Sequence, residues 1–375
     1  MKIVADDKIP FLKGALEPYA EVVYLPGKLI TREALMGADA LLIRTRTKCT
    51  ANLLEGTSVK FIGTATIGFD HIDVQYCNKQ NITWTNAPGC NSSSVQQYIA
   101  AALLKIAHEF RFKLADKTIG IVGVGNVGSK VEKLAKILGM NILLNDPPRA
   151  KKEDNNKFIA LNDILDNSDI ITAHIPLEFV GGDKTYHLFN EKIFRKMKKG
   201  AWFINSSRGE VTNTAALKKT IVSGKLGGAV IDVWENEPDI DPDLLEKTFI
   251  GTPHIAGYST DGKANGTAMV VNSLSKYFDL PLKSWYPENV PDPPAPEFSI
   301  DCTGKSEEDI IREAVNHTYD IAHDDFKLRF SPSDFEMHRG NYPVRREFAS
   351  YLVSLEHGTA KVTDMIKAMG FKTGK

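Results

Sequence analysis

Residues 120–128, GIVGVGNVG, decide the fold that the sequence predicts. Gly123, Gly125 and Gly128 have G-x-G-x-x-G spacing, directly after an apolar run and at the start of a helix-like pattern. The first glycine permits a tight turn, the second lets the backbone approach a pyrophosphate, and the third lets helix and strand pack closely. The free N–H groups at the helix N-terminus attract phosphate. This stretch therefore predicts a dinucleotide-binding βαβ unit.

A candidate ribose ligand follows at the separation that such a unit requires. The apolar run NILLND, residues 141–146, ends in Asp146. A carboxylate there would accept hydrogen bonds from the ribose hydroxyls and repel a 2′-phosphate, so NAD is favoured over NADP. Arg149 lies close enough in sequence to soften that preference. The structural alternative is a glycine-rich turn with a surface aspartate, which the strand–loop–helix context disfavours.

Strand-like and helix-like segments alternate on both sides of this unit. Apolar runs occur at residues 2–6, 20–26, 38–45, 59–65 and 82–87, and again at 117–124, 141–146, 169–176, 201–207, 228–234 and 248–253. Helix-like patterns cover residues 91–110, 126–139, 214–223 and 260–279. Such alternation is typical of parallel sheets. We therefore expect an α/β fold with two doubly wound parallel-sheet domains, Rossmann- or flavodoxin-like, one inserted in the other, and a C-terminal α+β dimerisation domain.

The domain boundaries follow from changes in the pattern of apolar, charged and proline residues along the chain. We expect a substrate domain at residues 1–90 and 258–285 and an NAD-binding domain at 91–257. Residues 286–297 are rich in proline and predict a stiff linker. Residues 298–375, with helix-like segments at 306–323 and 359–370, are near the small end for an independent core. We expect the linker to hold this part away from its own catalytic domain and a partner to stabilise it.

The composition restricts the function classes. Lys and Arg total 46 against 47 Asp and Glu, which argues against a general binder of nucleic acid or acidic lipid. The four cysteines lie far apart and none has C-x-x-C spacing, so no metal site is expected. The N-terminus lacks a signal-peptide pattern, and no apolar run is long enough to cross a membrane. A cytoplasmic protein is the expectation.

Three reactive residues follow late strands of the predicted NAD-binding domain. AWFINSSRGE (201–210) carries Arg208, GAVIDVWENEP (228–238) carries Glu237, and TFIGTPH (248–254) ends in His254. The carboxyl ends of parallel strands meet at one edge, where ligands bind. Singly, each residue has a structural alternative: a surface ion pair, an acidic turn or a packed histidine. Together they fit hydride transfer at a 2-hydroxy acid.

The expected roles are distinct. His254 would take the hydroxyl proton while the carbon-bound hydrogen leaves as hydride, and Glu237 would orient the imidazole and favour its charged form. Arg208 would bind the carboxylate with its fork of donors. A second cationic cluster, LLIRTRTKCT (41–50), places Arg44, Arg46 and Lys48 at an early strand end. It suits a phosphate dianion, although a solvated loop explains such a cluster equally well.

The segments GVGNVG, INSSRGEV, DVWENEP and TPHIAGYS resemble the D-isomer-specific 2-hydroxyacid dehydrogenase family over about residues 1–285. The resemblance implies Arg208 and Glu237 as active-site residues and His254 as the proton donor. It implies cofactor contacts at Gly123, Gly125, Asn126, Val127, Gly128, Asp146, Ile175, Ser206, Ser207, Arg208, Asp232 and Gly257. It implies substrate contacts at Thr45, Thr66 and Tyr258. Ile175 offers only its backbone.

Within the family, the segments IGFDHID (67–73), NAPGCNSSSVQQY (86–98) and DPPRA (146–150) most resemble members that act on a small phosphorylated hydroxy acid and dimerise through a C-terminal domain. The resemblance implies the same partners here: such a substrate and a second copy of the chain. Arg345 and Arg346 could then reach the partner's active site, although ordinary surface arginines are the simpler expectation. The alternatives are a 3-phosphoglycerate or other D-2-hydroxyacid dehydrogenase and a non-catalytic NAD-binding regulator.

Overall fold

The computed structural model describes residues 1–153 and 156–374, which form two compact units. Unit 1 comprises Met1–Asn91 and Ser259–Pro291, and unit 2 comprises Ser92–Tyr258 and Asp292–Lys375. The insertion of one α/β unit into the other was predicted. The C-terminal residues, however, belong to the same unit as the segment that carries the glycine-rich loop. The sequence predicts instead that the linker separates them.

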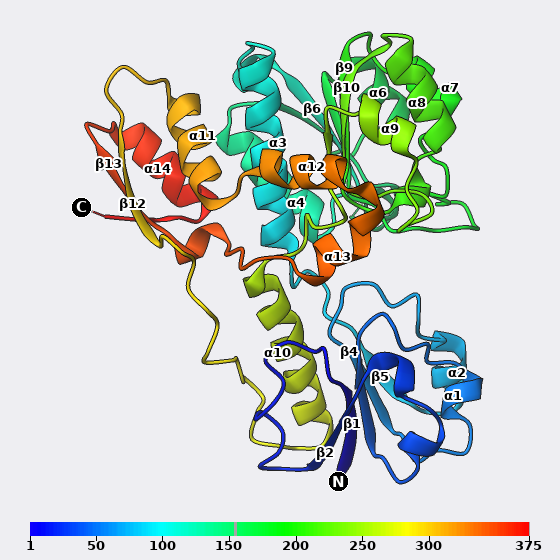
Figure 1. The fold of residues 1–375 in the computed structure, drawn as a ribbon. Coiled ribbons are helices and arrows are strands. Elements are labelled where there is room, and N and C mark those ends of the chain that lie inside the picture. The colour runs from blue at the N-terminus through cyan, green and yellow to red at the C-terminus, as the bar shows by residue number, and fades with distance from the viewer. Residues whose placement is uncertain (154–155, 375) are drawn as a thin grey trace. The chain divides into compact units, whose positions relative to one another are not determined.

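Unit 1 is built on a five-stranded parallel sheet with the order β2-β1-β3-β4-β5 (Figure 1). The strands are β1 (Lys2–Asp6), β2 (Glu21–Leu25), β3 (Ala40–Ile43), β4 (Phe61–Thr64) and β5 (Thr83–Thr85). The helices are α1 (Ala51–Leu54), α2 (Val74–Lys79) and α10 (Thr260–Tyr277), with 3-10 turns at Gly27–Leu29 and Glu33–Leu35. Val270, Val271 and Leu274 of α10 pack on one face of the sheet. This explains why residues so late in the chain return to the first unit.

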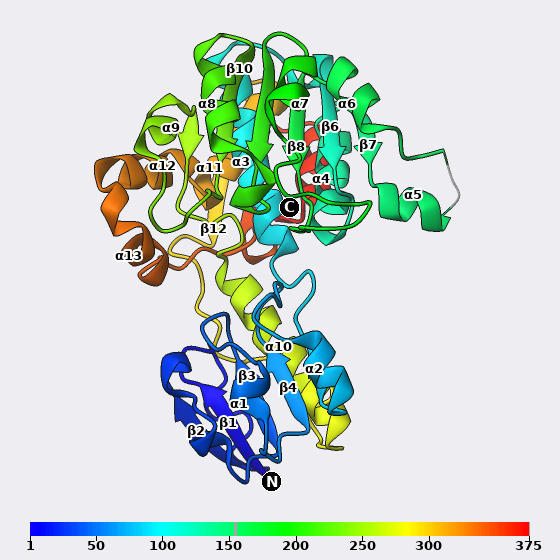
Figure 2. The ribbon, with the colours of Figure 1, turned by 90° about the vertical axis from the view of Figure 1, so that its right-hand side faces the viewer.

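Unit 2 is built on a six-stranded parallel sheet with the order β11-β10-β9-β8-β6-β7 (Figure 2). The strands are β6 (Thr118–Val122), β7 (Asn141–Asn145), β8 (Ile170–Ala173), β9 (Ala201–Asn205), β10 (Leu226–Ile231) and β11 (Ile250–Gly251). Their nearly continuous apolar sequences are buried on both faces, as parallel strands covered by helices must be. The two parallel-sheet domains that the sequence predicted are confirmed.

Helices cover both faces of this sheet. They include α3 (Ser92–Glu109), α4 (Asn126–Ile137), α6 (Leu161–Asn167), α7 (Glu191–Lys196), α8 (Thr214–Val222) and α9 (Pro242–Lys247), with 3-10 turns at Leu114–Asp116 and Gly209–Val211. Helix α5 (Pro147–Glu153) has no buried residue and extends away from the sheet (Figure 2). Helix α3 is the most central: its residues from Val95 to Ala107 are almost all buried. Helix α3 contacts α4 and the helices of the C-terminal residues, which explains why so much of its surface is buried.

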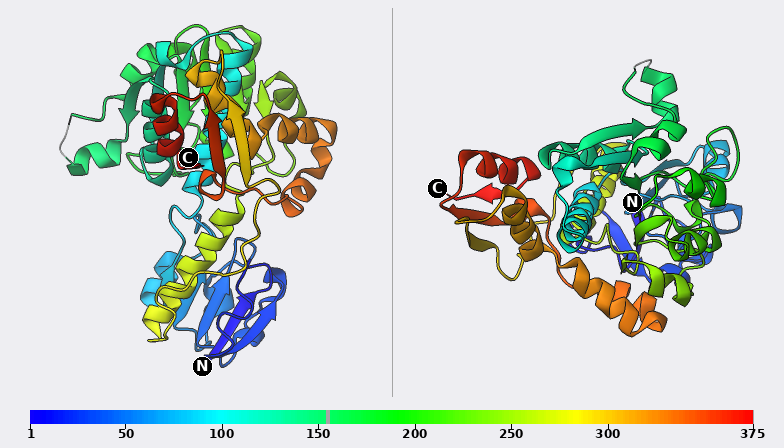
Figure 3. Two further views of the ribbon diagram at one scale, coloured as in Figure 1. Left: turned by 90° about the vertical axis from the view of Figure 1, so that its left-hand side faces the viewer. Right: turned by 90° about the horizontal axis from the view of Figure 1, so that it is seen from above.

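The C-terminal residues 292–374 form a small parallel sheet, β12-β13-β14, with its own helices (Figure 3). The strands are β12 (Glu297–Asp301), β13 (Leu352–Glu356) and β14 (Lys372–Thr373), and the helices are α11 (Glu307–Thr318), α12 (Ile321–Phe330), α13 (Phe335–Gly340) and α14 (Ala360–Met369), with 3-10 turns at Pro332–Asp334 and Phe348–Ser350. Helices lie in both crossovers between the strands. We call residues 292–374 the C-terminal segment.

This segment shares a hydrophobic core with α3 and α4. Ile311 and Val315 of α11 and Ile366 of α14 belong to the same buried cluster as Tyr98 and Leu134. The linker therefore does not hold the segment away from its own chain, because these apolar side chains are covered by α3 and α4 instead. A second difference concerns the helix expected at 306–323.

That expected helix is broken into α11 and α12. The chain is extended at Tyr319, whose side chain is buried and donates to the Asp324 carboxylate at 3.1 Å. Asp320 then caps the second helix by accepting the Ala322 N–H. A periodic pattern of apolar residues does not reveal such a break. Among the described residues, no helix combines the length and apolar character needed to cross a membrane.

Candidate active site

The glycine-rich loop lies between β6 and α4 in unit 2. Gly123 has φ +86, and a Cβ there would come within 2.5 Å of the His174 carbonyl oxygen. A Cβ on Gly128 would lie 2.0 Å from the Gly123 carbonyl oxygen, so helix and strand could not pack as they do. Gly125 precedes α4 and has open space at its Cβ position. Asn126 and Val127 begin the helix, whose first N–H groups receive no side-chain cap.

Asp146 lies at the end of β7, beside this loop. Its Oδ2 accepts the Val124 N–H at 2.8 Å and its Oδ1 accepts the Arg149 N–H at 3.0 Å. The Arg149 guanidinium bonds to Glu153 at 2.5 Å and to the Val124 carbonyl at 2.5 Å. Its charge is therefore already met by a carboxylate. This arrangement suits a ribose with free hydroxyls better than a 2′-phosphate.

Other predicted cofactor contacts follow the neighbouring strands. Ile175 comes after β8, and Ser206 and Ser207 come after β9. The Ser207 hydroxyl bonds to Asn205 at 2.8 Å, whereas the Ser206 Oγ is buried without a hydrogen-bond partner. A buried hydroxyl without a partner is able to bond to a polar group of a cofactor. The residues present therefore fit a dinucleotide, and they give Ser206 a free bonding position.

Asp232, at the end of β10, is 1% exposed and holds the segment from Thr252 to Tyr258, here named the catalytic loop. Its carboxylate accepts the Thr252 hydroxyl at 2.7 Å and the N–H groups of Ile255 and Ala256 at 2.8 and 3.0 Å. Burial raises the pKa of Asp232, although the His254 charge and these donors oppose that effect. Asp232 thus supports the loop, alongside any contact with a cofactor.

His254 and Glu237 form a hydrogen-bonded pair. The His254 Nδ1 lies 2.7 Å from Glu237 Oε2, and the other carboxylate oxygen accepts the Trp234 N–H at 2.9 Å. Burial by itself would raise the pKa of Glu237, but the hydrogen bond and charge of His254 together with the Trp234 N–H lower it. Because Nδ1 is occupied, Nε2 is the nitrogen left for a substrate. His254 also has φ +55, a conformation that costs energy in a residue with a Cβ.

Local hydrogen bonds hold Arg208 just after β9. Its carbonyl accepts a bond from Asn205 at 3.0 Å, and its guanidinium donates to the Ser207 carbonyl at 2.8 Å. The next residue must be glycine, because a Cβ on Gly209 would lie 2.0 Å from the Trp234 carbonyl. The strand end that carries Arg208 therefore rests directly on the turn that leads to Glu237.

A pocket of about 230 Å³ joins the three predicted residues, with the lining residues Arg208, Gly209, Glu210, Trp234, Asn236, Glu237 and His254. It lies at the carboxyl edge of the sheet, as the topology predicted. An arginine, an acid and a histidine in one pocket provide an anion-binding group and an oriented proton carrier. No cluster of residues suited to holding a metal ion is present in the described part of the chain.

The predicted substrate contacts are divided between the units. Thr45 follows β3 in unit 1 and is exposed. Thr66 follows β4; its hydroxyl donates to the Gly68 carbonyl at 3.0 Å and so accepts the bond from the Thr64 hydroxyl at 2.7 Å. Gly257 and Tyr258 end the catalytic loop and belong to unit 2.

Sequence reasoning missed one residue at this site and misplaced another. Arg339 of α13 donates to the Tyr258 hydroxyl at 3.1 Å and lies over its ring, 5.5 Å from the centroid. Arg345 was assigned either to a partner's active site or to the surface, but it is 4% exposed and bonds to its own chain. Arg346 lies 3.8 Å from Asp292. No sequence motif marks these arginines, since their positions depend on how the C-terminal segment folds back.

Comparisons with known proteins agree with this geometry. Residues 93–256 match the family described as D-isomer specific 2-hydroxyacid dehydrogenase, NAD binding domain, and residues 291–370 match a domain of unknown function (DUF3410). The chain is 51% identical over 354 residues to the erythronate-4-phosphate dehydrogenase of Bacteroides fragilis, covering 94% of this chain and 99% of that protein. It is 40% identical over 374 residues to the protein of that name from Proteus mirabilis, covering 99% of each.

Solved structures show the same fold. A D-lactate dehydrogenase from Aquifex aeolicus, complexed with NAD and lactic acid, has a TM-score of 0.62 and 26% identity, covering 74% of this chain and 96% of that one. A 3-phosphoglycerate dehydrogenase from Entamoeba histolytica with bound NAD has a TM-score of 0.63 at 24% identity, covering 74% and 95%. The predictions of an NAD-dependent enzyme and of its fold class are confirmed. The chain belongs to the erythronate-4-phosphate dehydrogenases, within the D-isomer-specific 2-hydroxyacid dehydrogenase family.

Proposed function

We propose that this chain oxidises 4-phospho-D-erythronate at C2 to 3-hydroxy-2-oxo-4-phosphooxybutanoate, with NAD as the hydride acceptor, in pyridoxal 5′-phosphate biosynthesis. The name shared by relatives that align over nearly the whole chain supports the substrate. The observation that carries the chemistry is the pair of His254 Nδ1 and Glu237 Oε2, 2.7 Å apart, in one pocket with Arg208.

The reaction breaks one O–H bond and one C–H bond. The His254 Nε2 accepts the hydroxyl proton, and Glu237 stabilises the imidazolium that results. The hydrogen at C2 leaves with its electron pair to the nicotinamide, which is the chemistry that NAD supplies when bound. Arg208 donates two parallel bonds to the substrate carboxylate and stabilises charge on the C2 oxygen.

The cofactor and substrate contacts are proposals of the same kind. The N-terminus of α4 and Ser206 would hold the dinucleotide, with Asp146 on the adenosine ribose. Thr45, Thr66 and Tyr258 would contact the substrate, and the cationic residues near Thr45 would favour its phosphate. We infer that the chain forms a homodimer through the C-terminal segment, where Phe326 and Phe330 are 65% and 79% exposed and stack 6.0 Å apart. A cytoplasmic location stays a prediction.

Two other functions were considered. A 3-phosphoglycerate dehydrogenase shares the core, but its regulatory tail is expected to alternate as βαββαβ, whereas this segment runs as one strand, three helices, a strand, a helix and a strand. A non-catalytic NAD-binding regulator would not need the His254–Glu237 pair.

Light scattering of a Phe326→Ser, Phe330→Ser variant tests the dimer: we expect monomers, and an unchanged dimer would place the interface elsewhere.

A panel of 2-hydroxy acids tests the reaction. NADH formed per active site is measured by absorbance and fluorescence, so that product retained on the enzyme is also counted. We expect 4-phospho-D-erythronate to give full turnover, and D-erythronate without the phosphate and 3-phosphoglycerate to be much poorer. Faster oxidation of 3-phosphoglycerate than of 4-phospho-D-erythronate would indicate a 3-phosphoglycerate dehydrogenase. No NADH with any acid, despite normal NADH binding, would favour the regulator.

A further inference from the structure

The catalytic loop is fixed from two sides. On the sheet side, Asp232 accepts the N–H groups of Ile255 and Ala256, as described above. The His254 N–H also donates to the Asp232 carbonyl, at 2.7 Å. On the opposite side, the Ala256 carbonyl accepts the Ser94 hydroxyl at 2.8 Å and the Arg345 Nη2 at 2.6 Å. Ala256 is thus held at its N–H by the Asp232 carboxylate and at its carbonyl by the Arg345 guanidinium.

Arg345 is unusual as a structural contact. It is 4% exposed, its Nε has no hydrogen-bond partner, and its guanidinium lies over the Tyr319 ring, 4.4 Å from the centroid. Burying a cation in this way is unfavourable unless charge nearby compensates it. The Arg345 Nη2 also bonds to the Ser94 hydroxyl, the second donor to the Ala256 carbonyl. Arg345 therefore holds the carbonyl both directly and through the serine.

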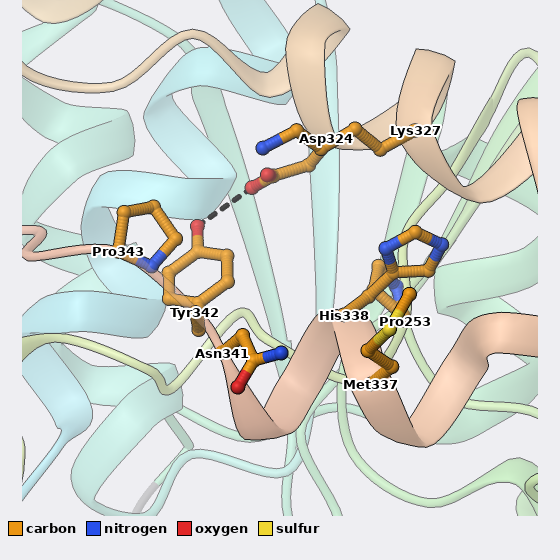
Figure 4. Close-up of a pocket in the computed structure, with 8 residues that line it drawn as sticks. All are labelled: Pro253, Asp324, Lys327, Met337, His338, Asn341, Tyr342 and Pro343. Carbon is orange, nitrogen blue, oxygen red and sulfur yellow. Dashed lines mark hydrogen bonds between the residues drawn. The ribbon is translucent and has the colours of Figure 1, made fainter.

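The compensating charge comes through a tyrosine. The Arg345 Nη1 lies 3.4 Å from the Tyr342 hydroxyl, which donates to Asp324 at 2.6 Å, and Asp324 is 7% exposed. Figure 4 shows the Tyr342 hydroxyl pointing at the Asp324 carboxylate. Both residues line a pocket of about 200 Å³ that is also lined by Pro253, the residue before His254. The network thus connects helix α12 to the immediate surroundings of the catalytic histidine.

Arg339 adds a second contact from the same part of the chain. It reaches Tyr258, the last residue of the catalytic loop, two residues beyond Ala256. Burial raises the pKa of Glu237; the charge of Arg339 helps to lower it, less than His254 and the Trp234 N–H do. Two arginines of the C-terminal segment therefore contact the loop behind the reacting groups, one at Ala256 and one at Tyr258.

We propose that Arg345 is a positioning residue for the reaction. Asp232 binds the Ala256 N–H and Arg345 binds the Ala256 carbonyl, so the two together fix the backbone of the catalytic loop. This keeps His254 at the strained backbone angle at which its imidazole bonds to Glu237. The C-terminal segment is thereby part of the catalytic apparatus of its own chain. This inference rests on the proposed function for its chemistry, since it assumes that His254 carries the proton.

The test compares Arg345→Lys with Arg329→Lys. Arg329 anchors α12 to the same unit through the carbonyls of Leu245 and Thr248, at 2.6 and 2.8 Å, and its hydrogen-bond partners lie outside the catalytic loop. Each lysine keeps the charge and loses the forked contact. Turnover, the Michaelis constant, the NADH dissociation constant and the melting temperature are measured for the full-length enzyme, on whichever 2-hydroxy acid the parent oxidises fastest.

We expect Arg345→Lys to lower kcat by about 10-fold or more, with the NADH dissociation constant within about 3-fold of the parent. Arg329→Lys should keep kcat within about 2-fold, whatever its melting temperature. Combining Arg345→Lys with Glu237→Gln should cost less than the product of the two single effects, because both act through the orientation of His254.

Tyr342→Phe provides a second, milder test if Arg345→Lys does not fold. It removes only the hydroxyl that links Arg345 to Asp324, and we expect a smaller loss of kcat, about 3-fold, in the same direction. The proposal is overturned if these variants keep parental kcat, or if kcat falls equally in the Arg329→Lys control. A parent that oxidises another 2-hydroxy acid, but not the phosphorylated one, would refute the proposed substrate and leave this comparison intact.

Discussion

The His254 Nδ1 lies 2.7 Å from Glu237 Oε2, and this distance fixes which nitrogen can do chemistry. The second oxygen of Glu237 is held by the Trp234 N–H, so the carboxylate cannot turn away. The imidazole therefore presents Nε2 to the pocket that Arg208 also lines. The pair determines how activity should depend on pH.

Glu237→Gln should move the alkaline limb of the reductive reaction to lower pH. The replacement removes the negative charge that lies 2.7 Å from His254 Nδ1, and with it an interaction that stabilises the proton-carrying pair. Reduction of the 2-oxo acid needs that proton, so the variant should lose reductive activity at a lower pH than the parent. The pH profile of kcat/KM measures the shift.

Glu235→Gln is the matched control for this experiment. Glu235 also bonds to a histidine, His187, at 2.6 Å, but it does not line the pocket. Its replacement should leave the alkaline limb in place. An unmoved limb in Glu237→Gln, or an equal shift in both variants, would contradict the assigned role. The stability that the pair contributes should be present above the usual carboxyl pKa and be lost as the pH falls through the lowered one.

Asp146→Ser should narrow the preference for NAD over NADP. The carboxylate at the end of β7 repels a 2′-phosphate, and Arg149 is already bonded to Glu153, so it offers the phosphate little. The ratio of kcat/KM for the two cofactors measures the change. A parent enzyme that uses both equally well would show that this interpretation of Asp146 is wrong.

Arg208→Lys should lower kcat/KM by roughly 10- to 100-fold, because a lysine cannot form two parallel bonds to a carboxylate. NADH binding, followed by fluorescence, should change little. Arg195→Lys is the control, since that arginine is an exposed partner of Glu191 on α7. Loss of NADH binding in Arg208→Lys would indicate that the residue supports the cofactor instead of the substrate.

Thiol labelling tests the packing of unit 1. Burial raises the pKa of Cys49 to about 12, with a contribution from Cys77, and both residues are buried. Cys90 is partly exposed. In the native protein at pH 8, we expect a thiol reagent to modify Cys90 first, and Cys49 and Cys77 only after unfolding. Rapid modification of Cys49 would show that this core is not formed as described.

The elements that the sequence predicted well are those with a local signal. The glycine spacing at residues 123–128 located β6 and α4, because tight turning and close packing demand glycine there. Parallel topology places successive strand ends at one edge of the sheet. The sequence could therefore predict that Arg208, Glu237 and His254 lie in one site. Apolar runs gave every strand of the two large sheets.

The parts that could not be predicted depend on contacts between distant residues. At the break, the buried Tyr319 bonds to Asp324, a contact that helical periodicity does not show. The position of Arg345 depends on α11 and α14 covering α3 and α4. A charged pair of arginines after a proline-rich linker suggested surface residues, and only the folded chain buries one of them against Ala256.

The central claim is that His254, paired with Glu237, takes a proton from a phosphorylated 2-hydroxy acid while NAD takes the hydride. A single-turnover experiment tests it most directly: enzyme in excess is mixed with 4-phospho-D-erythronate and NAD, and NADH is followed at one pH for the parent and for His254→Ala. We expect the parent to form NADH from this substrate. In the variant, the rate of NADH formation should fall by at least about 100-fold while NADH binding is kept. Equal rates in the two proteins, or no NADH from this substrate alongside ready oxidation of an unphosphorylated acid, would contradict the account.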